Sequence, residues 1–77
     1  MPHVIIKMYP GRTEETKLRL AERIAETVAE VAGCNESSVS VSVEETPKEE
    51  WAEKVYKPDI IEKGSTLYRK PGYNPFT

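Results

Sequence analysis

The sequence predicts an α/β (α+β) fold built on a βαβ unit, in which one long helix joins two parallel strands. Three observations lead to this prediction: an alternating apolar stretch at residues 3–9, an amphipathic stretch at 13–32, and a second alternating stretch at 39–44. Strands separated by a helix of about twenty residues are parallel and joined by a right-handed crossover. A short helix and an extended tail are expected to follow, within a single domain covering residues 1–77.

The stretch at 3–9 alternates between two faces. Val4, Ile6 and Met8 point to one face, whereas Ile5 and Tyr9 point to the other together with polar residues. The second face is therefore partly apolar. We expect the chain's own tail or another subunit to cover it.

The stretch at 13–32 carries signals for both ends of a helix. A turn at Pro10–Gly11 precedes it, Thr13 is expected to be the N-cap, and Gly33 is expected to end it in a left-handed conformation. The predicted apolar stripe consists of Leu20, Ala21, Ile24, Ala25, Val28, Val31 and Ala32. Charged residues fill the opposite side, which is typical of a solvated helix face.

The stretch at 39–44 has strict period-two patterning. Its valines, Val39, Val41 and Val43, are expected to meet the helix, while Ser40 and Ser42 face away. Two strands alone do not form a stable sheet. We therefore expect a homo-oligomer that extends the sheet, with a twofold dimer favoured.

The C-terminal part is expected to begin with a second helix. Residues 46–49, Thr-Pro-Lys-Glu, have the pattern of a capping box, and the predicted helix carries Trp51 and ends before Pro58. A separate helical turn starting at Pro58 and running through residue 63 is a further option. The aromatic stretch at 67–76 is expected to be extended, with a turn at Pro71–Gly72. Such a tail gains little alone, so we expect it to lie across a neighbouring subunit.

Composition excludes several classes of function. Eleven basic and thirteen acidic residues are interleaved along the chain, with a net charge of −2, so no nucleic-acid surface is expected. The longest uncharged apolar run is short, residues 4–6, and no secretion signal is visible, which predicts a cytoplasmic protein without membrane contact. Cys34 and His3 are the only residues of their types, so we expect no internal disulfide and no cluster of soft metal ligands.

Pro2 is the first candidate for chemistry. It follows the initiator Met1, which methionine aminopeptidases remove before small residues, so the mature chain is expected to begin with a secondary amine. Burial and a neighbouring cation both lower the pKa of such an amine, which lets it accept a proton at neutral pH. A proline at the first residue of a strand also has a purely structural explanation, because its missing N–H costs nothing there.

Three further features accompany Pro2. They are the turn at residues 10–13 with Arg12, the strand start at 38–41 with Ser40, and Trp51 in the second predicted helix. With Pro2, this pattern resembles the 4-oxalocrotonate tautomerase family from residue 2 to about residue 51. The tail with its Lys-Pro-Gly-Tyr sequence at 70–73 is similar to a branch of longer bacterial members that form dimers, whereas shorter members are trimers of dimers. The resemblance therefore implies a dimer and leaves a hexamer as the alternative assembly.

The resemblance implies a role for each candidate. Pro2 matches a general base that moves a proton between oxygen and carbon of a 2-hydroxydienoate or an enolpyruvate such as phenylenolpyruvate. Arg12 matches an arginine that binds a substrate carboxylate through its bidentate guanidinium. Trp51 stands where the family usually has a phenylalanine that lines an apolar pocket. Ser40 stands where many members have a second arginine, and a neutral hydroxyl is the weaker donor, so a monocarboxylate enol is favoured over a dicarboxylate.

Assembly and reaction type leave alternatives open. Arg12 lies ten residues beyond Pro2, a span of about 30 Å when extended, so the arginine at each site is expected to come from a neighbouring subunit. A hydratase or dehalogenase that uses protonated Pro2 as an acid is one alternative to a tautomerase. A non-catalytic, oligomeric binding module is another. His3, Lys7 and Tyr56 are further hydrogen-bonding candidates to which the sequence assigns no position.

Overall fold

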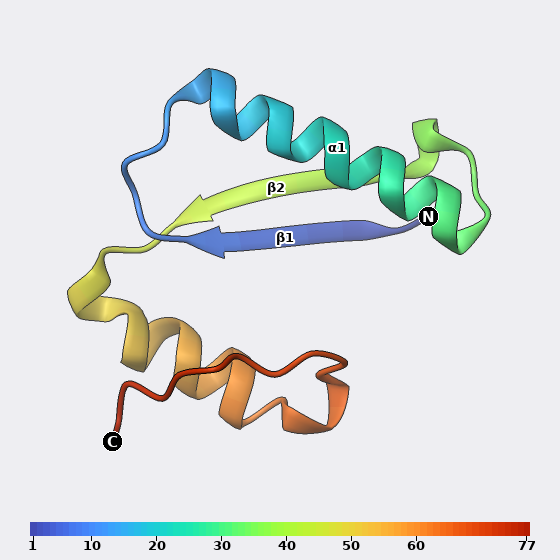
Figure 1. Cartoon of the computed structure of the whole chain (residues 1–77). Coiled ribbons are helices and arrows are strands. Elements are labelled where there is room, and N and C mark those ends of the chain that lie inside the picture. The colour runs from blue at the N-terminus through green and yellow to red at the C-terminus, as the bar shows by residue number, and fades with distance from the viewer. The chain divides into compact units, whose positions relative to one another are not determined.

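The structure, a computed structural model, describes residues 1–77 and divides them into two units, Met1–Glu45 and Thr46–Thr77. The first unit contains two strands and one long helix, and the second contains short helical segments and the C-terminal tail (Figure 1). Each unit is described by itself below.

The two strands of the first unit are β1 (His3–Met8) and β2 (Ser40–Glu45). They are parallel, and their register pairs His3 with Ser40 at one end and Met8 with Glu45 at the other. The helix α1 connects them along one face of the sheet (Figure 1). The predicted βαβ unit is therefore confirmed, with β2 beginning one residue later than expected.

Helix α1 (Glu14–Ala32) begins and ends where its capping residues predict. The Thr13 hydroxyl accepts a hydrogen bond from the Thr16 N–H at 3.1 Å. Gly33 has φ 74°, a left-handed conformation that favours glycine, and its N–H bonds to the Ala29 carbonyl. The covered part of the apolar stripe is shorter than predicted, because Val31 in the last turn is 78% exposed.

An ion-pair cluster joins the first turn of α1 to the end of β2. The Lys17 amine lies 2.6 Å from Glu14 and 3.4 Å from Glu45. The hydrogen bond that Lys17 donates to the Glu14 carboxylate raises the pKa of Lys17, desolvation opposes it, and Glu45 acts in the same direction as Glu14. Lys17 is therefore positively charged throughout the neutral range, and it holds the helix start against the strand end.

Within the first unit, no other element covers the sheet face that points away from α1. Because paired residues of a parallel register share a face, His3 with Ser40 and Ile5 with Ser42 form two successive pairs on it. The side chain of Ile5 is 52% exposed there. No residue of the first unit is fully buried, so its apolar surfaces are only partly covered.

The second unit begins with two helical segments, η2 (Lys48–Glu50) and η3 (Ala52–Ile61). The predicted capping box at 46–49 is wrong: η2 is preceded by Pro47 as its cap residue, and no side chain caps it. Instead, the Glu50 N–H bonds to the Pro47 carbonyl at 3.0 Å, which forms a tight single turn.

The prediction that the second helix ends before Pro58 is also wrong, because η3 continues through Pro58 to Ile61. A proline inside an α-helix lacks an N–H, and its ring clashes with the carbonyl four residues earlier. Segment η3 has the wider π-helical turn, in which each N–H reaches back five residues, as Glu62 does to Lys57 at 3.0 Å. The wider turn relieves the clash and lets the helix continue.

The tail folds back onto η3 of its own chain. After η4 (Gly64–Thr66), the Tyr73 ring lies 5.3 Å from the Tyr56 ring and the Phe76 ring lies 6.1 Å from it, measured between centroids. The hydrogen-bonded turn lies at 74–77, where the Thr77 N–H reaches the Asn74 carbonyl, and only a bend occurs at Gly72. Tyr73 and Phe76 of the tail thus have contacts within the chain, whereas Tyr68 is fully exposed. None of the helices has the length and apolar character needed to cross a membrane.

Candidate functional site

Pro2 lies directly before β1 and is half-buried. Its carbonyl accepts a hydrogen bond from the Ser40 N–H at 3.1 Å, so it is fixed to the first residue of β2. Met1 is fully exposed, with a relative accessibility of 102%. Pro2 is therefore held in the sheet, whereas the residue before it packs against nothing.

Ser40 is hydrogen-bonded on its side chain as well as its backbone. Its hydroxyl oxygen lies 2.6 Å from Nδ1 of His3. The strand register places both side chains on the open face of the sheet, at the end where Pro2 enters. The structure therefore brings Pro2, His3 and Ser40 together. The sequence named His3 without a position, because the pair depends on the register of the two strands, which only the structure gives.

Arg12 lies in the loop between β1 and α1, at the opposite end of β1 from Pro2 (Figure 1). The strand that lies between the two has six residues and alone spans about 20 Å at strand geometry. The Arg12 side chain is exposed and forms no ion pair within the chain. A single chain therefore does not bring Arg12 to Pro2, in agreement with the expectation from the sequence.

Trp51 belongs to the second unit, where it is half-buried between η2 and η3. Its indole N–H donates to the Tyr73 hydroxyl at 2.7 Å. The Tyr56 hydroxyl in turn donates to the Tyr73 carbonyl at 2.9 Å, and Tyr56 is 93% buried by its relative accessibility of 7%. Sequence reasoning missed Tyr73 as the partner of Trp51, and an aromatic residue in the tail was the only signal for it.

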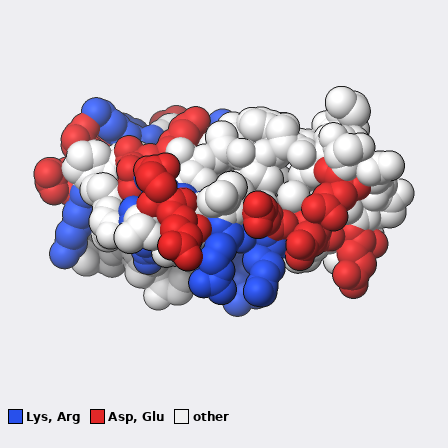
Figure 2. All heavy atoms as spheres, turned by 90° about the horizontal axis from the view of Figure 1, so that it is seen from above, with Lys and Arg blue, Asp and Glu red and all other residues white.

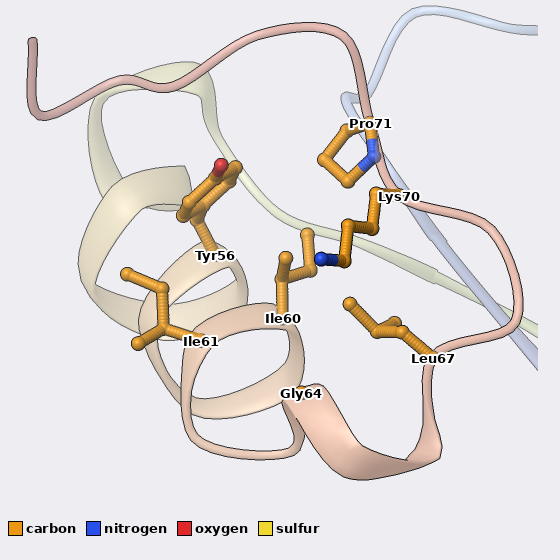
Figure 3. A pocket seen from close by; sticks show the side chains of 7 residues that line it. All are labelled: Tyr56, Ile60, Ile61, Gly64, Leu67, Lys70 and Pro71. Carbon is orange, nitrogen blue, oxygen red and sulfur yellow. The ribbon is translucent and has the colours of Figure 1, made fainter.

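A pocket of about 400 Å³ lies in the second unit beside η3 (Figure 3). Its lining consists of Tyr56, Ile60, Ile61, Gly64, Leu67, Lys70 and Pro71. Lys70 is the one charged residue in this otherwise mostly apolar lining, and its amine points inward in Figure 3. None of the four predicted site residues lines this pocket.

Charged side chains on the face that α1 covers are mixed in sign. Figure 2 shows lysine and arginine beside aspartate and glutamate on this face, without a continuous basic patch. No group of three or more His, Cys, Asp or Glu side chains is arranged to hold a metal ion. The hydrogen-bonded side chains at the end of the sheet where Pro2 enters are the imidazole of His3 and the hydroxyl of Ser40.

Comparisons with known proteins add to this geometry. A family model described as "Tautomerase enzyme" matches residues 2–55. A probable tautomerase of Xylella fastidiosa (strain 9a5c) is 45% identical over 73 residues, which cover 95% of this chain and 89% of the relative. Tautomerase PptA of Enterobacter sp. (strain 638) is 39% identical over 75 residues, covering 96% and 99%. The crystal structure of YwhB, a homologue of 4-oxalocrotonate tautomerase, superimposes with a TM-score of 0.63 at 39% identity, covering 70% of this chain and 88% of that one.

Proposed function

The chain belongs to the tautomerase family and is an isomerase, and we propose that it interconverts the enol and keto forms of a small enol carboxylate with Pro2 as the general base. The position of Pro2 carries this proposal. It is half-buried, it lies directly before β1, and its carbonyl is fixed to Ser40. Full exposure of Met1 makes that residue accessible for removal, which leaves Pro2 with a free secondary amine.

The proposed reaction moves one proton. The neutral Pro2 nitrogen takes the proton from the enol oxygen, and the oxygen's electron pair forms the C=O bond. The electrons of the former C=C bond then take the same proton from Pro2 at the adjacent carbon. Pro2 returns to its neutral form, no cofactor takes part, and the proton balance is zero. A base of this kind works best when its pKa lies near the working pH.

Three side chains provide substrate binding in this proposal. Arg12 binds the carboxylate, since its exposed guanidinium has no partner within the chain. Ser40 donates to the substrate oxygen beside Pro2, and Trp51 provides an apolar wall. With one guanidinium and one neutral hydroxyl, the site favours a monocarboxylate enol such as phenylenolpyruvate over a dicarboxylate dienol.

The site as proposed needs more than one chain, and we favour a homodimer. Arg12 and Pro2 lie at opposite ends of β1, so the arginine comes from a neighbouring subunit. The open sheet face with Ile5, 52% exposed, and the two-stranded sheet itself also support an assembly that adds strands. Light scattering at low micromolar concentration measures the oligomeric state, and a monomer would contradict this part of the proposal.

Replacing Pro2 tests the proposed mechanism. Ketonisation of phenylenolpyruvate is followed by ultraviolet absorbance, on protein whose N-terminus has been verified by intact mass. We expect Pro2→Ala to lower kcat by about 100-fold or more, the upper contribution of a positioned general base being 10⁴. Full activity of Pro2→Ala would overturn the mechanism. Halide release from 3-haloacrylates without ketonisation would instead assign the scaffold to dehalogenation.

Mixing the Pro2→Ala and Arg12→Ala variants, with kcat/KM as the measured activity, tests the shared site. We expect Arg12→Ala to raise KM for the enol carboxylate and leave kcat less affected, because it removes substrate binding. When Pro2→Ala and Arg12→Ala subunits are dissociated and reassociated together, each mixed dimer regains one intact site. Random pairing in a twofold dimer then restores about a quarter of wild-type activity. No restoration would show that Pro2 and Arg12 act within one chain.

A further inference from the structure

His3 and Ser40 form a hydrogen-bonded pair directly beside Pro2. They are opposite each other in the register of β1 and β2, and Nδ1 of His3 lies 2.6 Å from the Ser40 hydroxyl oxygen. The Ser40 N–H is already bonded to the Pro2 carbonyl at 3.1 Å. Ser40 is therefore held on its backbone by Pro2 and on its side chain by the imidazole.

The imidazole decides where the proton of the Ser40 hydroxyl points. A serine hydroxyl has one proton to donate and two lone pairs to accept with, whereas each imidazole nitrogen is a donor or an acceptor according to its protonation. When Nδ1 of His3 carries a proton, it donates to Ser40, and the serine proton is left for another acceptor. When Nδ1 is bare, the serine proton is used on the ring.

We propose that His3 is a positioning residue for the tautomerase reaction: its Nδ1–H donates to the Ser40 hydroxyl and thereby directs the serine proton toward the substrate oxygen beside Pro2. This inference rests on the proposed function of Pro2. Through this relay, an imidazole replaces part of the polarising effect that a charged donor would provide at Ser40. No net proton transfer occurs between His3, Ser40 and the substrate, since each group keeps its own proton.

The relay has a specific energetic signature. Donors directed at developing charge act mainly on the transition state, so their loss lowers kcat more than it raises KM. We expect His3→Leu and Ser40→Ala each to lower kcat by about tenfold. Removing an oxyanion-hole donor typically lowers kcat by about 10²–10³. The smaller effect is expected here because the His3–Ser40 pair is exposed to solvent. The double variant should be no worse than either single variant, because both remove the same relay.

Two further variants separate positioning from a structural role. In His3→Asn, the amide nitrogen lies near the position of Nδ1 and can donate to Ser40, so we expect it to recover most of the activity lost in His3→Leu. The control is Ser42→Ala, which removes a hydroxyl from the next register pair on the same sheet face. We expect its kcat to equal that of the wild type.

A spectroscopic measurement reports on the pair without activity. His3 is the only histidine, so the nitrogen resonances of its ring are assigned without ambiguity. We expect Nδ1 to carry a proton in the wild type and its chemical shift to change in Ser40→Ala but not in Ser42→Ala.

The inference is overturned if the kcat losses of His3→Leu and Ser40→Ala multiply in the double variant. It is equally overturned if His3→Leu keeps full kcat, if His3→Asn recovers no more activity than His3→Leu, or if Nδ1 is bare in the wild type. In each of these outcomes Pro2→Ala is still inactive, so they leave the proposed function standing. An active Pro2→Ala protein would instead remove the proposed function itself.

Discussion

The two units of this chain differ in how they combine regular structure with burial. The βαβ unit, Met1–Glu45, has complete strands and a capped helix of 19 residues, yet none of its residues is fully buried. The C-terminal unit, Thr46–Thr77, has short helical segments and an irregular tail, yet it contains the two buried hydrophobic residues, Val55 and Tyr56. The comparison teaches that backbone hydrogen bonding, within α1 and between β1 and β2, organises the first unit, whereas side-chain packing organises the second.

This difference has a functional counterpart. The first unit carries His3 and Ser40 on one sheet face, at the end where Pro2 enters β1, and it exposes apolar residues such as Ile5 and Leu18, at 52% and 60%. A site on such a face needs another surface to exclude water. In the proposed assembly, a second copy of the chain supplies that surface together with Arg12.

The largest expected effect comes from removing the packing of the C-terminal unit. Tyr56→Ala deletes a ring that contacts Tyr73 and Phe76, and we expect it to lower the free energy of unfolding by about 3–5 kcal/mol. Trp51 is the only tryptophan and lies in this unit, so its fluorescence in urea measures the loss. In the control Tyr56→Phe, only the hydrogen bond to the Tyr73 carbonyl is lost, at a cost of about 1 kcal/mol. Equal effects of the two variants would contradict the packing explanation.

A smaller effect on the free energy of unfolding is expected from replacing Gly33, the left-handed residue that ends α1. Gly33 has φ 74°, and a Cβ there meets no atom within 4 Å, so Gly33→Ala adds only the conformational cost of about 1–2 kcal/mol. Far-UV circular dichroism in urea measures it. Gly64→Ala is the matched control, since Gly64 has no left-handed backbone and equally open surroundings. If neither substitution changed the free energy of unfolding, the stability of the first unit would not depend on the left-handed backbone at Gly33.

The smallest effect concerns the link between Trp51 and the tail. Tyr73→Phe removes the hydroxyl that accepts the Trp51 indole N–H and keeps the ring against Tyr56. We expect a loss of about 1 kcal/mol or less and a change in the Trp51 emission maximum. Tyr68→Phe serves as the control, because Tyr68 is fully exposed at 102%. An unchanged emission spectrum in Tyr73→Phe would show that the tail does not hold the indole.

The same contrast explains how much the sequence could predict. The elements β1, α1 and β2 follow from periodicity and from the capping residues Thr13 and Gly33, which act locally. The continuation of η3 through Pro58 could not be predicted, because it depends on a wide helical turn that relieves the proline clash. The contact between Trp51 and Tyr73 spans 22 positions of irregular chain, so no local pattern encodes it.

The candidate site was predictable to a similar extent. Pro2, Arg12, Ser40 and Trp51 were named from the resemblance to a family, and the position of Arg12 at the far end of β1 followed from strand length alone. The pair of His3 with Ser40 needed the register of the two strands, which period-two patterning does not fix along the strand direction. Their roles in catalysis stay predictions until the variants are measured.

Titration of the Pro2 nitrogen tests the central claim most directly. In protein labelled with ¹⁵N-proline and freed of Met1, only the terminal proline nitrogen among the six prolines changes its chemical shift with pH. The account predicts that this nitrogen loses its proton at or below about pH 7, under the value near 8 of an ordinary α-amino group. A nitrogen that stays protonated well above pH 8 in the assembled protein would contradict the role of Pro2 as a general base.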